Sequence, residues 1–384
     1  MWKNRIKRVI SFCYIVGFML MITVPLLLTN RDGEAISEKE LRPLAKRPPL
    51  MVDGKFNEKL FSRIDDYFDD RIGFRDELII LNARLQFYMF GRLENPEKYR
   101  LGPNGEANII ERDVVQTFQH KNLMSNEELD NIAESFTKIN NYLESRNCKY
   151  FYVTCYDKES IYPEYFPNSV NQYGDVSRTD QFIDRLKAKS DVNVIDIKPA
   201  FLNLRDEYEL YAPKGDPVHW TPRGGYLGYK EIMKAFNAVC GEDYYVLSED
   251  DFDINITDQG WYFYGGLKLE NYSEDFVLKE PKAKLVNNVS DYYDLPYTEN
   301  IYLYRNENAG NDSRLLIMGN SYTVGYILPY FAESFGEVLW LHRSDCKDYF
   351  RECIECYNPD ILLSQTAERY ISYSEMIRVA DGLP

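Results

Sequence analysis

Short apolar strands and amphipathic helices alternate along the chain from about residue 127 onward, and this alternation constrains the fold more than any other feature. Runs rich in β-branched and aromatic residues predict strands at 149–155, 192–197, 314–318, 338–341 and 360–364. Apolar residues at helical spacing predict helices at 127–145, 180–189, 224–238 and 322–335. Such alternation is typical of a sheet covered by helices on its faces. The sequence therefore predicts an α/β domain over residues 126–384.

One segment interrupts the alternation. Residues 247–306 are rich in Tyr, Asp, Asn and Gly and contain short alternating runs such as 261–264 and 301–304. Alternation of this kind is typical of half-buried strands. We interpret the segment as a β-rich insertion and expect it to wall a cleft.

The N-terminus has the pattern of a membrane anchor. Lys3, Arg5, Lys7 and Arg8 precede an apolar run over residues 9–29, which matches the ~20 residues that a helix needs to cross a bilayer. A basic flank stays in the cytoplasm, so residues 1–8 form a cytoplasmic tail and everything after the run lies outside. The alternative is a cleaved signal peptide, but its apolar part is ~7–15 residues long and ends in a small-x-small site, which this run lacks. We favour the uncleaved anchor.

A small helical subdomain is predicted between the anchor and the α/β domain, within residues 30–125. Residues 30–49 are polar and carry prolines, as expected for a linker. From Phe56 the apolar residues follow a helical period until Gly73 interrupts them, and a second apolar helix at 78–90 ends at Gly91.

Composition limits the possible partners. The chain carries a formal net charge of −16, and it has no basic run outside the N-terminus, so we expect no nucleic-acid partner. Of its cysteines, Cys353 and Cys356 have the spacing of a redox or zinc motif, but they lack a second pair or a histidine pair. We therefore expect neither a metal nor a cofactor. The disulfide pairing of the cysteines outside the membrane cannot be deduced from their positions.

Histidine is scarce, with three in the chain, and one of them has a carboxylate close by in sequence. In Asp216-Pro217-Val218-His219 the carboxylate precedes the imidazole by three residues, so a loop could bring it to the ring nitrogen that faces away from a nucleophile. The alternative is a histidine that completes a turn begun by Asp216.

A serine suited to nucleophilic attack follows the predicted strand at 314–318. In Gly319-Asn320-Ser321 a strand-to-helix turn would expose the serine hydroxyl, and the helix N-terminus would aim free N–H groups at an oxyanion. We expect Gly319 to permit the sharp turn. The alternative is an ordinary turn, since these residue types are common in turns.

Together the two motifs resemble the SGNH hydrolase superfamily, in which a Gly-Asp-Ser block supplies the nucleophile and an Asp-x-x-His block supplies the base. Asn320 replaces the Asp of the first block, and His219 precedes Ser321, which reverses the usual order. Reversed order is what a circularly permuted domain would have. The resemblance implies a flavodoxin-like sandwich.

A narrower resemblance is to the AlgX/AlgJ SGNH hydrolase-like family of polysaccharide O-acetyltransferases and the related DHHW family. It is carried by segments at 37–44, 68–75, 157–164 and 211–225. In that family the Asp lies two residues before the His, where this chain has Pro217. Asp216 instead has the spacing of the wider superfamily, and a loop one residue longer would have to bring it to His219.

The resemblance implies acyl transfer through an acetyl-enzyme, with Ser321 as nucleophile, His219 as base and Asp216 as the group that steadies the imidazolium. Trp220 also matches the family signature, and it would serve either as a sugar-binding platform or in packing. The acceptor would be a polysaccharide outside a bacterial cell membrane, and a separate membrane-bound acyltransferase would supply the acetyl groups. Two alternatives remain: an acetyl esterase that uses the same residues with water, and a non-catalytic glycan-binding or assembly protein.

Overall fold

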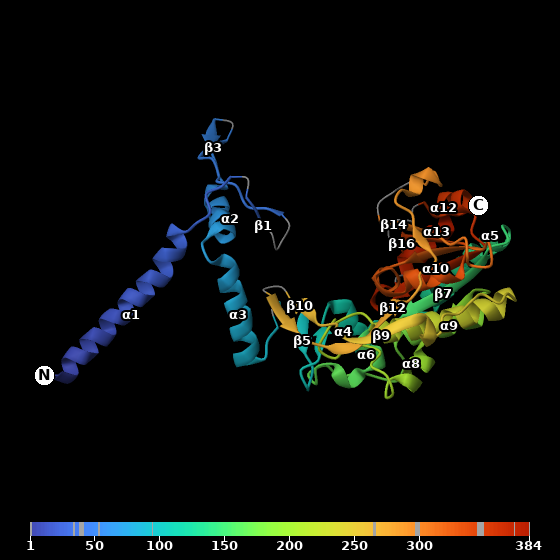
Figure 1. Ribbon diagram of the computed structural model, residues 1–384, viewed down its shortest axis with the longest axis horizontal. Helices are drawn as coiled ribbons and strands as arrows, with labels where there is room; N and C mark the ends of the chain where they lie inside the picture. Colours follow the sequence, from blue (N-terminus) through green and yellow to red (C-terminus); the bar gives the residue numbers. More distant parts are fainter. Residues whose placement is uncertain are drawn as a thin grey trace. The chain divides into compact units, whose positions relative to one another are not determined.

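A computed structural model describes residues 2–33, 35–37, 42–52, 54–93, 95–263, 266–295, 300–343, 349–371 and 373–383 (Figure 1). The chain divides into two compact units. The first contains residues 1–94 with 263–267, and the second contains residues 95–262 with 268–384.

The first unit is mainly helical. Its helices are α1 (Trp2–Leu27), α2 (Leu60–Arg71) and α3 (Arg75–Phe90), and its short hairpins pair β1 (Ile36–Ser37) with β2 (Arg42–Pro43) and β3 (Met51–Val52) with β4 (Lys55–Phe56). Within α1, residues Arg5–Leu27 are long and apolar enough to cross a membrane. Gly91 ends α3 with a φ of 59°, in the left-handed region that glycine adopts readily. Residues 38–41 of the family-like segment at 37–44 lie outside the described residues.

The second unit is built on a seven-stranded sheet with the order β13-β14-β16-β15-β17-β7-β8. The strands are β7 (Lys149–Cys155), β8 (Asn193–Ile195), β13 (Lys284–Leu285), β14 (Ile301–Arg305), β15 (Arg314–Gly319), β16 (Glu337–His342) and β17 (Ile361–Ala367). The five strands from β16 to β8 are parallel, whereas β14 and β13 pair antiparallel at one edge. The predicted α/β fold is confirmed.

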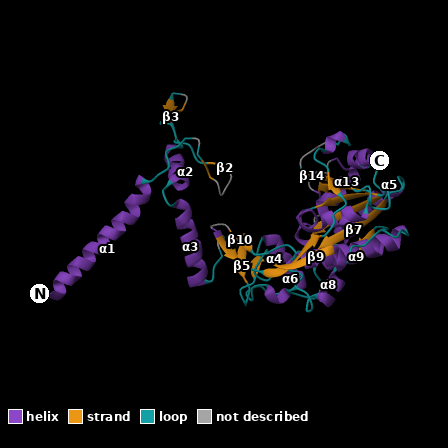
Figure 2. Cartoon of the chain, in the orientation of Figure 1, coloured by secondary structure: helices purple, strands orange, loops and turns teal. Residues whose placement is uncertain are grey.

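Helices cover both faces of this sheet, as Figure 2 shows for the second unit. Alternate residues of each strand point to opposite faces, so Phe151 and Val153 of β7 join one core cluster while Tyr150 and Tyr152 join the other. The first cluster includes side chains of α9 (Pro222–Cys240) and α10 (Leu328–Ser334). The second includes side chains of α5 (Asn126–Glu144), α7 (Arg178–Lys189), α12 (Phe350–Tyr357) and α13 (Tyr373–Asp381). The result is a three-layer α/β sandwich.

Shorter elements complete this unit and do not extend the central sheet. They are β5 (Tyr99–Leu101), β6 (Ala107–Ile109), α4 (Arg112–Phe118), α6 (Lys158–Ile161), α8 (Lys198–Leu204), β9 (Phe252–Asp258) and β12 (Tyr272–Leu278). The short strands β10 (Trp261–Phe263) and β11 (Leu267–Leu269) each have residues assigned to both units. β9 and β12 form an antiparallel ribbon inside the segment expected to be an insertion. The C-terminal end of that segment is different, because β14 pairs with β16 and so belongs to the central sheet. The expectation that the insertion extends to residue 306 is therefore wrong at its end.

The sheet order creates one favourable place for a site. β15 lies in the middle, with β16 on one side and β17 on the other, so the chain after β15 adds one strand on each side of it. In open parallel sheets, ligands bind beyond the carboxyl ends of the strands at such a switch point. The residues that follow Gly319, the last residue of β15, occupy this place.

Candidate active site

Ser321 lies at the switch point, at the start of the helical segment that follows β15. It is exposed, while the residues on both sides of it, Asn320 and Tyr322, are buried. The segment begins with a π-helical stretch, Thr323–Ile327, and becomes α10 at Leu328, with Pro329 in its first turn. The single helix predicted over 322–335 is thus two consecutive segments, because proline fits a helix best at its first turn. The N–H groups of a helical first turn have no acceptor within the helix, so that of Ser321 is available for an incoming oxygen.

Gly319 lies where there is no room for a side chain. It is not among the glycines with positive φ, so its role is to avoid a side-chain clash, as expected, and not to adopt a left-handed conformation. A Cβ atom there would lie 2.9 Å from Trp340 Nε1, 3.0 Å from Gln365 Oε1 and 3.2 Å from Thr323 Oγ1. Glycine therefore lets the end of β15 lie close against side chains of β16 and β17.

The structure brings Ser321, His219 and Asp216 into one hydrogen-bonded row. Nε2 of His219 lies 2.7 Å from Oγ of Ser321. Nδ1 of the same ring lies 2.8 Å from Oδ2 of Asp216. Both distances are those of good hydrogen bonds.

Asp216 is fixed by its own loop. Its Oδ1 accepts hydrogen bonds from the backbone N–H groups of Val218 at 2.8 Å and His219 at 3.1 Å, which leaves Oδ2 for the imidazole. Burial disfavours the charged carboxylate, but the hydrogen bonds and charge of His219 and the N–H of Val218 outweigh it, and the pKa of Asp216 is lowered. Asp216 is thus an ionised, positioned partner for the ring.

A buried lysine stabilises this loop through hydrogen bonds to its backbone. Lys158 is fully buried, and its Nζ donates hydrogen bonds to the carbonyl oxygens of Ala107 at 2.9 Å, Ala212 at 2.7 Å and Asp216 at 2.8 Å. Burial lowers the pKa of Lys158 to about 8, although Asp216 and other nearby acids oppose the shift. Because all three donors of an ammonium group are used, Lys158 connects the loop that contains Ala212 and Asp216 to Ala107 of β6.

Tyr322 joins the serine segment to the histidine loop. Its buried hydroxyl donates to the carbonyl oxygen of Val218 at 2.8 Å, and its ring lies edge-on to the imidazole of His219 at 4.9 Å between centroids. The same hydroxyl lies 3.3 Å from Oδ1 of Asp157, a buried carboxylate paired with Arg369. The residue after the serine therefore sets the position of the loop that carries the base.

Trp220 is a packing residue. It is 1 % exposed, and its ring lies 5.1 Å from that of Tyr322. Three glycines of α9 make room for it: a Cβ at Gly224, Gly225 or Gly228 would lie 3.0 or 3.1 Å from a Trp220 atom. The expected sugar-binding role of Trp220 is therefore wrong, because a sugar cannot stack on a ring enclosed in the core.

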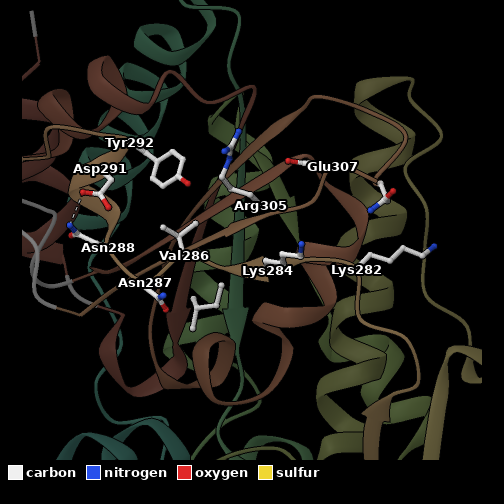
Figure 3. Close-up of a pocket in the computed structure, with 11 residues that line it drawn as sticks. Lys282, Lys284, Val286, Asn287, Asn288, Asp291, Tyr292, Arg305 and Glu307 are labelled. Carbon is white, nitrogen blue, oxygen red and sulfur yellow. Dashed lines mark hydrogen bonds between the residues drawn. The ribbon is translucent and has the colours of Figure 1, made fainter.

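Elsewhere in the second unit, Figure 3 shows a pocket beside β13 and β14. It has a volume of about 380 Å³, and basic Lys284 and Arg305 share its lining with acidic Asp291 and Glu307. The Arg305 guanidinium lies 4.9 Å from the centre of the Tyr292 ring. Its lining residues do not include Ser321 or His219, so it is separate from the catalytic candidates.

Comparison with known protein families gives a match over part of the second unit. Residues 116–260 match a family described as SGNH hydrolase-like domain, acetyltransferase AlgX. The chain is similar to the AlgX family of SGNH hydrolase-like domains. This confirms the predicted resemblance. The match includes Asp216 and His219 and ends before Ser321, whose place is known from the structure. None of the curated protein sequences compared with the chain matches it.

One solved structure supports the fold, and two others are similar to the chain with lower scores. Bacillus cereus PatB1 with a sulfonyl adduct is 15 % identical, with a TM-score of 0.52 over 72 % of this chain and 95 % of that one. The O-acetyltransferase domain of Pseudomonas putida AlgJ is 10 % identical, with a TM-score of 0.47 over 74 % and 99 %. A DHHW family protein from Eubacterium siraeum is 13 % identical, with a TM-score of 0.46 over 75 % and 96 %.

The AlgX-family pattern and this chain differ at the carboxylate, and the structure shows how the loop accommodates the difference. Asp216 reaches Nδ1 of His219 from three residues away because its Oδ1 closes a tight turn with the N–H groups of Val218 and His219. Sequence reasoning missed the supporting side chains. Lys158 lies in a family-like segment without an assigned role, and no local pattern marks Tyr322 or Tyr326, whose hydroxyl lies 3.4 Å from Asp216 Oδ2.

Proposed function

We propose that this protein is a membrane-anchored, extracytoplasmic acetyltransferase that acts on a polysaccharide through Ser321, His219 and Asp216. The observation that carries the proposal is the continuous row of hydrogen bonds from Ser321 Oγ through the imidazole to the buried carboxylate. Such a row is what nucleophilic acyl transfer requires. A non-catalytic role would not require an exposed serine to end the row.

The first half-reaction would acylate the serine. Ser321 Oγ attacks the carbonyl carbon of an acetyl ester while Nε2 of His219 takes the hydroxyl proton, and the Asp216 carboxylate stabilises the imidazolium. The backbone N–H of Ser321 stabilises the oxyanion. Collapse of the tetrahedral intermediate breaks the bond to the leaving alcohol, which takes the proton from Nε2 and leaves an acetyl group on Ser321.

The second half-reaction would regenerate the serine. Nε2 of His219 takes a proton from a polysaccharide hydroxyl, and the resulting oxygen nucleophile attacks the acetyl carbonyl. The proton then returns to Ser321 Oγ as its bond to the acetyl carbon breaks. If water takes the place of the sugar hydroxyl, the same residues make an esterase, so the acceptor decides between the two activities.

The catalytic proposal can be tested with purified full-length protein and p-nitrophenyl acetate. We expect acetyl release that Ser321→Ala and His219→Ala each reduce by at least about 10³-fold. His120→Ala is the matched control, since His120 lies away from the site and its Nδ1 is 3.0 Å from the carbonyl oxygen of Gly174. Equal rates for the wild type and Ser321→Ala would refute a catalytic serine.

The acceptor is tested in a second assay. Addition of a soluble oligosaccharide to the same reaction should divert acetyl groups from water to sugar hydroxyls, and mass spectrometry of the oligosaccharide would detect this. Acetate release without any acetylated sugar, over a panel of neutral and acidic oligosaccharides, would favour the esterase.

The membrane location rests on α1, whose residues Arg5–Leu27 are long and apolar enough to span a bilayer, with basic residues at its N-terminal end. We propose that α1 is retained as an anchor and that the remaining chain is extracytoplasmic. The resemblance to the AlgX family supports a separate membrane-bound acyltransferase as the source of acetyl groups. Alkaline extraction of bacterial membranes should leave the full-length chain in the pellet, whereas a shortened chain in the supernatant would indicate signal cleavage.

A further inference from the structure

Helix α3 in the first unit is apolar on two opposite faces. At ~100° per residue, Ile79, Ile80, Ala83 and Phe87 share one face. Ala83 is buried, and Ile80 lies against Gly266, where a Cβ would approach its side chain to 3.3 Å. Ile79, Ile80 and Phe87 are half-buried, so this face is partly covered within the unit.

The opposite face is exposed. It carries a row of apolar side chains that we call the α3 seam: Phe74, Leu78, Leu81, Leu85, Tyr88 and Met89. Each of them is at least 45 % exposed, and the row spans ~100° of the helix surface. Glu77 and Arg84 border it on one side and Arg75 and Asn82 on the other. An apolar stripe of this length with a polar border marks a surface that contacts something apolar.

The seam is continuous with the apolar surface of α1. The N-terminal part of the seam, at Phe74, Leu78 and Leu81, lines one apolar groove together with Leu20, Met21, Val24 and Pro25 of α1. The joint before α3 is bonded to the end of α1, because Gly73 N–H donates to the Pro25 carbonyl at 3.0 Å. A Cβ at Gly73 would lie 3.1 Å from that same carbonyl oxygen, so the close approach requires glycine. The first turns of α3 therefore lie beside residues that belong to the apolar span.

From this continuity we propose that the α3 seam is a membrane surface: α3 lies in the outer leaflet beside α1, with the seam in contact with lipid acyl chains. An interfacial helix needs an apolar face for the lipid and polar side chains at the border, and α3 has both. Tyr88, near its C-terminal end, is a residue type that favours the lipid–water boundary. The proposal rests on the membrane anchor of the proposed function.

The features of the seam favour lipid over two other possible occupants. A second copy of the chain would cover the seam only if the α1 helices of the two copies lay side by side. A protein domain packed on the seam would need polar groups that pair with Glu77 and Arg84 at its border. Lipid acyl chains need no complementary polar rim. The α1 residues in the shared groove would already be surrounded by lipid. The consequence for function is that the stalk leaving the membrane is held at the bilayer surface by two helices.

The test uses full-length protein in nanodiscs whose lipids carry bromine on the acyl chains. Cys13, Cys240, Cys346 and Cys356 are replaced by serine, and a bimane fluorophore is placed on a single introduced cysteine. Leu85→Cys probes the seam, and the neighbouring Arg84→Cys is the matched control because it points ~100° away on the same helix. Ile15→Cys within α1 reports on the anchor.

We expect the brominated lipids to quench the label at position 85 about threefold more strongly than the label at position 84, with position 15 quenched strongly as well. If the label at 15 is quenched and the label at 85 is not, the anchor stands and the membrane role of α3 is overturned. If neither is quenched, the anchor itself fails and this proposal fails with it. A label at 85 that is shielded from both lipid bromine and aqueous iodide would show a protein partner, which also overturns the proposal.

Discussion

The hydroxyl oxygen of Ser321 lies 2.7 Å from Nε2 of His219, although 102 residues separate them in the sequence. The parallel sheet makes this meeting possible, since β15 delivers the serine to its carboxyl edge while the loop before α9 delivers the histidine. The Tyr322 hydroxyl, bonded to the Val218 carbonyl at 2.8 Å, connects the two segments directly.

Asp216→Asn should lower acetyl release by about 10³–10⁴-fold, because an amide can present the wrong group to Nδ1 and cannot stabilise the imidazolium. The rate constants of purified variants measure this. Tyr326→Phe is the matched control: its hydroxyl lies 3.4 Å from Asp216 Oδ2, a weak contact, so its loss should cost less than about tenfold. Equal losses in the two variants would contradict a special role for the carboxylate.

Much of the fold could be predicted from the sequence because the strands of a buried parallel sheet are short apolar runs. The strand predicted at 149–155 coincides with β7. Residues 301–305 were harder, because their alternation fits any half-exposed strand, and only their pairing with β16 places them in the central sheet.

The candidate site was predictable in part. Motifs mark residues that carry chemistry, so Ser321, His219 and Asp216 could be chosen from the sequence. Residues that hold those groups have no motif. Lys158 acts through three carbonyl oxygens that are more than 50 residues away in the sequence. Trp220 matches a signature that also fits a sugar platform, and only the structure shows that it is buried in the space left by the glycines of α9.

Lys158→Met should lower the free energy of unfolding by about 3 kcal/mol, because three carbonyl oxygens lose a charged donor. It should also slow acetyl release, since Asp216 loses its backbone support. Chemical denaturation and the ester assay measure the two effects. Lys214→Met, in the same loop but exposed, is the matched control and should change neither.

The titration of Lys158 predicts how the unfolding free energy changes with pH. Its pKa is about 8 in the folded protein, below the 10.5 of an unperturbed lysine, so between these values the unfolded chain binds the extra proton. Lys158 therefore makes stability rise with pH over that window, by up to about 1.4 kcal/mol per pH unit. The difference in unfolding free energy between the wild type and Lys158→Met should grow from pH 8 to pH 10. A constant or shrinking difference would contradict the assignment.

Asn320→Asp should keep the fold and the activity, and this explains why the chain tolerates Asn where the SGNH block has Asp. Asn320 precedes the helical segment, and its Oδ1 accepts the Tyr322 N–H at 3.1 Å, a bond that a carboxylate can also accept. Its Nδ2 is buried without a partner among the described residues, so the amide nitrogen contributes no bond that Asp would lose. We expect the unfolding free energy of Asn320→Asp to stay within about 1 kcal/mol of the wild type, and Asn320→Ala to lose about 1 kcal/mol. Greater damage from Asp than from Ala would show that the amide has another role.

Gly224→Ala tests whether the packing around Trp220 requires glycine in α9. A Cβ there would collide with the Leu210 carbonyl oxygen and lie 3.0 Å from Trp220 Cβ, and neither atom belongs to a flexible side chain that could move away. We expect a loss of about 2–3 kcal/mol in unfolding free energy and a displaced His219, hence slower acetyl release. Gly325→Ala is the control, because a Cβ at that helical position meets nothing within 4 Å and should be neutral or stabilising by about 0.5 kcal/mol. If Gly224→Ala and Gly325→Ala have the same effect on thermal unfolding, the packing around Trp220 does not require glycine in α9.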